Sequence, residues 1–248
     1  MIGRQVAQAM AEHRCGGGLR VTISAPEGER LAKKTFNPRL GIVGGISILG
    51  TSGIVRPMSE AALIDSLRLE QDMLAAAGAT DIVVTPGNYG ETFAREVLGL
   101  GLGRWCTCSN YIGEAIDHAA GLGFRSLLLV GHVGKLCKVA AGVMNTHSRV
   151  ADGRREALCT HAALCGGDRA TVEALYRAVT TDDAVAVLDR AGLRAAVMAS
   201  LTQALDEQLK RGAGAGMDIE AIFFSNRYGI LGRTAGAGKL SALHPISS

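Results

Sequence analysis

The stretch LLLVGHVGKLCKVAAGVMNTHS, residues 127–148, decides the fold of this chain. It begins with four apolar residues, a pattern typical of a strand buried on both faces of a parallel sheet. A turn from Gly131 to Gly134 follows, and a helical pattern then runs from Val133 to Met144. Because ligands of open α/β sheets bind at the carboxyl ends of the strands, this turn is a candidate ligand site.

Reactive and basic side chains gather in this stretch. Position alone makes His132, Lys135 and Lys138 site candidates, and His147 lies at the other end of the predicted helix. Simpler explanations compete with each role: packing or capping for the histidines, and solvated side chains for the lysines, which lie three residues apart on one helix face. Asn88, in the turn after another predicted strand, has the same two interpretations, because Asn also stabilises turns.

The glycine turn does not match a nucleotide triphosphate loop. That motif requires a glycine five positions before the Gly-Lys pair and a Ser or Thr after it, but Leu129 and Leu136 occupy those positions. The full G-x-G-x-x-G fingerprint of dinucleotide-binding proteins is absent from the sequence as well. A nucleotide triphosphatase is therefore excluded as the leading interpretation.

A metal site is not predicted either. His132 and His147 are about fifteen residues apart along one helix, so they share a metal only if the chain folds back between them. The six cysteines form no C-x-x-C pair, and small buried thiols are the simpler interpretation.

Composition limits the function classes. Hydrophobic residues make up 48% of the 248 residues and charged residues 20%, which excludes a disordered chain. The net charge of +3 and the small number of aromatic residues argue against nucleic-acid binding. No apolar run approaches the roughly 18 residues of a membrane span, and the N-terminus lacks the apolar core of a signal peptide. We therefore expect a cytoplasmic protein with no nucleic-acid or membrane partner, and we leave a homo-oligomer open.

The remaining patterns alternate between helix and strand. We expect an N-terminal amphipathic helix, strands at 19–24, 82–84, 127–130 and 219–224, and helices at 60–77, from 91, and at 110–120, 154–164, 169–179, 182–191 and 194–211. The segment 41–55 is either a bulged strand or, as we favour, a loop whose backbone contacts a ligand. The order predicts an α/β fold with a mostly parallel sheet flanked by helices.

Four segments resemble one known family. They are TFNPRLGIVGGISILGTSGIVRPMS (35–59), TPGNYG (85–90), SNYIGEAID (109–117) and GHVGKLCKVAAGVMNTHSRVADGRRE (131–156), and they resemble the CbiD family, the cobalt-precorrin-5B carbon-1 methyltransferases. The resemblance implies methyl transfer from S-adenosylmethionine to a cobalt-bound tetrapyrrole in anaerobic cobalamin biosynthesis, giving cobalt-precorrin-6A. The cobalt then belongs to the substrate and not to the protein.

The resemblance also implies roles for particular residues. His132 and His147 are the expected catalytic residues, assisting proton or charge movement on the ring. The methyl donor is expected at Gly44, Gly45, Thr51, Ser52, Gly87, Asn88 and Gly131. The substrate carboxylates are expected at Lys135, Lys138, Asn145, Thr146, Ser148 and Arg149.

The sequence departs from the family in one large respect. Members of the family carry an N-terminal domain with a Thr-Thr-Gly-Thr-Cys signature, and the sequence contains no such segment. We therefore expect residues 1–35 to be the end of a truncated α+β domain and residues 36–248 to form the α/β domain with the ligand crevice. The competing function is a non-catalytic module that binds a corrinoid or adenosyl ligand.

Overall fold

The computed structural model describes residues 2–35, 38, 41–47 and 59–246. Its contacts divide the chain into two units, Met1–Ser66 and Leu67–Ser248. The domain boundary that we place after residue 35 stays a prediction, because several residues that follow it lie outside the described ranges.

The N-terminal unit is described as helices and irregular chain. It contains α1 (Ile2–Glu12), as expected, α2 (Gly28–Ala32), and the first residues of α3 (Glu60–Ala76). The strand expected at 19–24 is wrong: this segment is irregular and its apolar side chains Leu19, Val21 and Ile23 are about half exposed. Alternation of apolar residues favours a strand only where another strand pairs with it.

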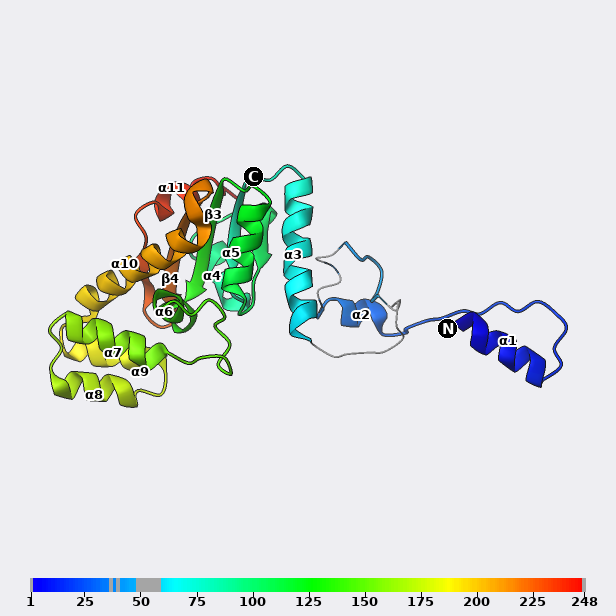
Figure 1. The fold of residues 1–248 in the computed structure, drawn as a ribbon, viewed down its shortest axis with the longest axis horizontal. Coiled ribbons are helices and arrows are strands. Elements are labelled where there is room, and N and C mark those ends of the chain that lie inside the picture. Colours follow the sequence, from blue (N-terminus) through cyan, green and yellow to red (C-terminus); the bar gives the residue numbers. More distant parts are fainter. Residues whose placement is uncertain (1, 36–37, 39–40, 48–58, 247–248) are drawn as a thin grey trace. The chain divides into compact units, whose positions relative to one another are not determined.

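The second unit is built on a five-stranded sheet (Figure 1). The strands are β1 (Asp81–Thr85), β2 (Trp105–Thr107), β3 (Ser126–His132), β4 (Asp218–Ser225) and β5 (Gly229–Arg233). Their order is β2-β1-β3-β4-β5, and every neighbouring pair is parallel except β4 with β5. The expected α/β class and mostly parallel sheet are confirmed.

Helices cover both faces of this sheet. One face packs against α4 (Asn88–Glu96) and α11 (Ala237–Ser241), and its core includes Val130, Phe93 and Phe224. The other face packs against α6 (Val133–Ala140) and α10 (Arg194–Ala213), and α5 (Ile112–Gly121) packs beside α10. The strands β1 and β3 are therefore buried on both sides, as their continuous apolar runs predict.

Three further helices lie between α6 and α10 in the chain. They are α7 (Arg154–Leu164), α8 (Arg169–Arg177) and α9 (Thr181–Arg190), and Figure 1 shows them grouped at the lower left, near the start of α10. Short 3-10 turns lie at Leu102–Arg104 and Gly214–Gly216. The bounds of α7 agree with the prediction, and those of α8, α9 and α10 differ by one or two residues.

The structure corrects three local predictions. Strands β2 and β5 were not predicted. The three residues of β2 are too few for a recognisable hydrophobic pattern, and the glycines of β5 weaken its pattern. Helix α6 ends at Ala140 instead of Met144, since Gly142 has a φ of 82° that ends a helix. Helix α3 ends at Ala76, one residue before the predicted end; Ala77 is exposed, whereas the polar Glu70 and Gln71 on the helix are buried.

His244 makes the stability of this fold sensitive to acid. The side chain is 2% exposed, and neither ring nitrogen has a hydrogen-bond partner among the described residues. Burial lowers the pKa of His244; Arg104 lowers this pKa further, and Asp81 opposes the shift. The unfolded chain therefore takes up a proton near the ordinary histidine pKa of about 6.5, while the folded protein resists it.

We therefore predict that the free energy of unfolding falls as the pH drops below about 6.5, and falls less in His244→Phe. The phenylalanine keeps the ring and removes the unpaired nitrogens, so the variant is expected to be at least as stable at pH 7.5. Urea unfolding at pH 7.5, 6.5 and 5.5 measures both values. Parallel loss of stability in the two proteins contradicts this assignment.

Candidate functional site at the carboxyl edge of the sheet

The ends of the four parallel strands bring the candidate residues together. Gly87 and Asn88 follow β1, Ser109 and Asn110 follow β2, and His132 ends β3. The strand order reverses between β1 and β3, and ligands of open α/β sheets bind outside the carboxyl ends at such a reversal. This edge is therefore the candidate site on architecture alone.

Lys135 ties two of these strand ends together. Its half-buried Nζ donates hydrogen bonds to the carbonyl oxygen of Pro86 and to that of Ser109, both at 2.9 Å. Burial lowers the pKa of this ammonium group. An ammonium has three N–H donors, so one remains for a ligand at the point where the strand order reverses. A solvated surface lysine, the simple alternative, is wrong for this residue.

The loop after β2 is held in an unusual backbone conformation. Ser109 has a φ of 52°, a left-handed value that non-glycine residues rarely adopt, and its carbonyl is one of the two that Lys135 binds. Such conformations cluster at functional sites, where surrounding contacts maintain them. Beside it, burial raises the pKa of the Cys108 thiol to about 12, so this thiol stays protonated and is no nucleophile.

The contacts of His132 define which nitrogen carries its proton. Nδ1 accepts a hydrogen bond from the backbone N–H of Gly134 at 3.1 Å, so the ring caps the start of α6. Burial lowers the pKa of His132, and the nearby Asp182 opposes this shift. Because the pKa is lowered overall, the ring is neutral at neutral pH. A neutral ring that accepts at Nδ1 carries its proton on Nε2. His132 therefore presents a hydrogen-bond donor, and its free nitrogen is not a base.

The structure adds two residues that the sequence patterns did not reveal. Ser225, fully buried at the end of β4, donates to Oδ1 of Asp182 at 2.7 Å. Asp182 belongs to the first turn of α9, and its charge acts on His132. No local signal identified this pair, because the two residues are 43 positions apart and meet only through the fold.

Several predicted substrate ligands already have structural partners. Lys138 is 4% exposed, and its Nζ donates to the carbonyl oxygens of Thr146 at 3.0 Å and Ala151 at 3.1 Å. Thr146 is buried and bonds to Asn110 through its backbone N–H and its hydroxyl. Asn145 Oδ1 accepts the backbone N–H of His147. These contacts give Lys138, Asn145 and Thr146 a role in holding the loop after α6.

The end of that loop is open to solvent. His147 Nδ1 accepts a hydrogen bond from the backbone N–H of Arg149 at 3.1 Å, so His147 stabilises a turn. It does not cap α6, because that helix ends seven residues earlier. Ser148 and Arg149 are exposed. Their substrate-binding roles and the catalytic role of His147 stay predictions.

The glycines predicted at the methyl donor fall in different places. A side chain added at Gly131 would meet Pro86 at 2.9 Å and Leu136 at 3.1 Å, so this glycine serves packing of the core. Gly87 precedes α4 at the candidate edge, and the exposed Asn88, which we expected in the turn, is the first residue of α4. Gly44 and Gly45 line a cavity of about 470 Å³ within the N-terminal unit. Thr51 and Ser52 lie outside the described residues.

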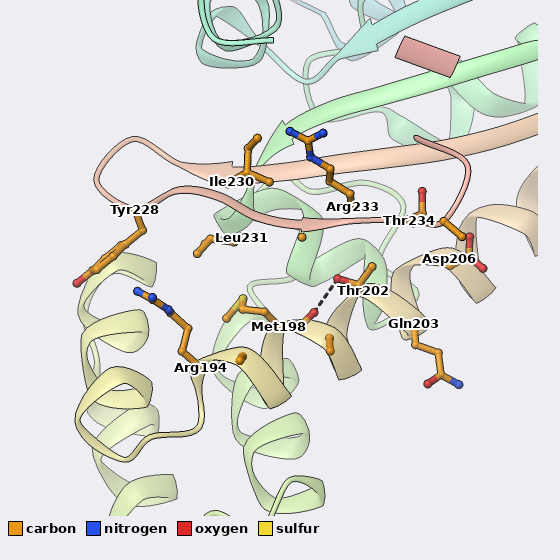
Figure 2. A pocket seen from close by; sticks show the side chains of 14 residues that line it. Arg194, Met198, Thr202, Gln203, Asp206, Tyr228, Ile230, Leu231, Arg233 and Thr234 are labelled. Atoms are coloured by element: carbon orange, nitrogen blue, oxygen red, sulfur yellow. Dashed lines mark hydrogen bonds between the residues drawn. The ribbon is translucent and has the colours of Figure 1, made fainter. Parts of the chain in front are cut away.

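The second unit has several cavities, among them a large groove and a smaller slot. A groove of about 640 Å³ runs between α10 and β5, with Arg194 and Tyr228 at one end and Asp206 at the other (Figure 2). It contains none of the predicted site residues. A smaller cavity of about 280 Å³, which we call the α4 slot, lies between α4 and the turn from β4 to β5. The α4 slot adjoins the carboxyl edge, since Ser225 lines it.

Two negative findings hold for the described residues. They contain no group of three or more His, Cys, Asp or Glu side chains placed to hold a metal ion. Within the same ranges, no helix is both long and apolar enough to cross a membrane.

The sheet, its strand-order reversal and the polar residues at its carboxyl edge define an α/β ligand-binding domain. Residues 1–57 match the family described as CbiD, and residues 145–235 match the CbiD C-terminal domain. The chain belongs to the CbiD family.

The names of similar proteins are consistent with membership in this family. The chain is 48% identical over 226 residues to a protein of Ruminiclostridium cellulolyticum named cobalt-precorrin-5B C(1)-methyltransferase, covering 91% of the chain and 59% of that protein. It is 41% identical over 240 residues to a protein of the same name from Alkaliphilus metalliredigens, covering 97% of the chain and 63% of that protein. The chain thus spans about three fifths of the length of these relatives.

A crystal structure of the cobalamin biosynthesis protein cbiD from Archaeoglobus fulgidus is 31% identical in sequence, covering 63% of this chain and 49% of that one. The TM-score between the two structures is 0.24.

Proposed function

We propose that this chain takes part in methylation of carbon 1 of cobalt-precorrin-5B, with S-adenosylmethionine as the methyl donor and cobalt-precorrin-6A as the product. The observation that carries the proposal is the 48% identity, over 91% of the chain, to a relative named for this reaction. The polar carboxyl edge supplies a site at the place where an α/β fold binds small molecules. In the reaction, the bond between methyl carbon and sulfur breaks as the bond to the ring carbon forms, and S-adenosylhomocysteine leaves.

The charges of the carboxyl edge fit the two reactants. Lys135 has one N–H donor left for a carboxylate of the tetrapyrrole, and the exposed Arg149 offers another cation. The Asp182 carboxylate is close enough to His132 to raise the pKa of that ring, and a negative charge at this place suits the sulfonium of the donor. Methyl transfer from an activated sulfonium needs mainly alignment, so residues that fix the strand ends matter most.

His132 enters this proposal as a hydrogen-bond donor. We predict that His132→Asn lowers the rate of methyl transfer about tenfold, the effect of one lost hydrogen bond of roughly 1.4 kcal/mol. Asparagine is a good helix N-cap, so α6 is expected to keep its start and the free energy of unfolding to change little. His118→Gln, on α5 and outside the predicted site residues, is the matched control and should retain the wild-type rate. If His132→Asn and His147→Gln combined leave methyl transfer unchanged, neither histidine acts in catalysis.

The direct test is transfer of a labelled methyl group from S-adenosylmethionine to cobalt-precorrin-5B by the purified chain, with calorimetric titration of each reactant. Turnover supports the enzyme. Binding of the donor or of the corrinoid without turnover supports the competing function, a non-catalytic binding module. If the chain binds neither reactant, both functions are wrong for it.

A further inference from the structure

The α4 slot is unlike the rest of the carboxyl edge, because it carries no charge. On one side, α4 contributes Tyr89, Thr92 and Phe93, and Val97 directly follows that helix. On the other side, Ser225 ends β4, Asn226 lies in the turn, and Gly229 begins β5. None of these side chains is acidic or basic. A tetrapyrrole with several carboxylates would find no cation here, so the slot is not suited to that substrate.

Aromatic rings form much of the slot. Phe93 is buried and stacks on Phe224 with centroids 3.8 Å apart, so its position is fixed by the core. Tyr89 is 71% exposed, although it lies one turn before Phe93 on the same helix. An exposed ring beside a buried one offers a flat ligand an apolar surface to cover.

Polar groups in the slot suit a heterocycle with both donors and acceptors. The side-chain amide of Asn226 is exposed and provides one donor group and one acceptor group, and Thr92 provides a hydroxyl. Ser225 is already bonded to Asp182, which fixes the turn that carries Asn226. The volume of about 280 Å³ lies at the lower end of ligand pockets, which suits a nucleoside and excludes a macrocycle.

The slot also adjoins the predicted reaction centre. The ring of His132 packs edge-on against Phe224, with centroids 5.7 Å apart and an interplanar angle of 87°. Phe93 of the slot packs on the same Phe224 ring. The slot is therefore linked to His132 through the Phe93 and Phe224 rings and to Asp182 through Ser225, so the sulfonium end of a donor bound there could extend toward these two residues.

From these contacts we propose that the α4 slot binds the adenosyl group of the methyl donor, with the adenine ring between Tyr89 and the turn that carries Asn226. The assignment rests on the proposed function for the identity of the donor. It moves the donor site away from Gly131 and from the N-terminal glycines, to a slot of which the segment TPGNYG includes only Tyr89.

Equilibrium dialysis of the full chain with S-adenosylhomocysteine, and separately with adenosine, tests the assignment without turnover. Tyr89→Ala and Asn226→Ala should each weaken binding of both probes about tenfold, as losses of ring contact and of a hydrogen bond do. Val97→Trp, which fills the slot from its exposed rim, should weaken it at least as much. Affinity for the corrinoid should stay at the wild-type value in all three variants, which shows that they are folded.

Gln203→Ala is the matched control, because it removes an exposed side-chain amide from the groove of Figure 2 and should leave both affinities unchanged. Wild-type affinity in the three slot variants, or equal weakening in Gln203→Ala, overturns the slot while the proposed function stands. A wild-type chain that binds neither probe overturns the slot and the adenosyl donor together.

Discussion

Replacing Lys138 by methionine should destabilise the protein by about 2–4 kcal/mol, the cost of leaving two largely buried carbonyl groups without a partner. The Nζ atom donates to the carbonyl oxygens of Thr146 and Ala151 and lies 3.8 Å from Asp152 Oδ1. Methionine fills nearly the same volume, so the loss reports the ammonium group and not a cavity. The free energy of unfolding in urea measures it.

The matched control is Lys239→Met. This lysine is exposed, and its nearest carboxylate oxygen, on Asp218, is 3.9 Å away, so the substitution should change the free energy of unfolding by less than about 0.5 kcal/mol. Hydrogen exchange adds a local readout, because the loop after α6 should exchange faster in Lys138→Met. Equal stability of the two variants would mean that Lys138 does not hold this loop.

The hydrogen-bond partners of the two lysines on α6 could not be predicted from the sequence. The sequence places Lys135 and Lys138 correctly on one helix after β3, and this spacing fits solvated side chains or ligand contacts equally well. In the structure both ammonium groups bind carbonyl oxygens of loops that precede or follow the helix. Such partners are distant in the chain or belong to irregular segments, for which no periodic pattern exists.

Most of the fold could be predicted from the sequence, because its central strands and helices have strong hydrophobic patterns. Continuous apolar runs located β1, β3 and β4, and the helical patterns after Ser148 located α7 to α10. The sequence could not reveal how the strands pair, and only the pairing brings Ser225 beside Asp182 and Phe224 beside His132. The residues of the α4 slot were missed for the same reason.

Gly90→Ala should destabilise the protein by about 1–3 kcal/mol, the usual cost of adding a methyl group to a filled core. Gly90 lies in the first turn of α4, where the helix crosses the sheet. An added Cβ would lie 2.6 Å from the carbonyl oxygen of Val130 and 2.9 Å from Cβ of Thr85. Both are held in the sheet, so α4 itself has to move.

A displaced α4 should affect both the stability of the fold and the binding of the donor. The helix carries Tyr89, Thr92 and Phe93, so Gly90→Ala should weaken binding of S-adenosylhomocysteine as well as lower the free energy of unfolding. Gly121→Ala, at the end of α5, is the control: no atom lies within 4 Å of its added Cβ, and alanine favours a helix by up to about 1 kcal/mol. If Gly90→Ala unfolds at the same urea concentration as Gly121→Ala, α4 does not lie against β3 as closely as described. If it loses stability but keeps its affinity, the donor does not depend on the position of α4.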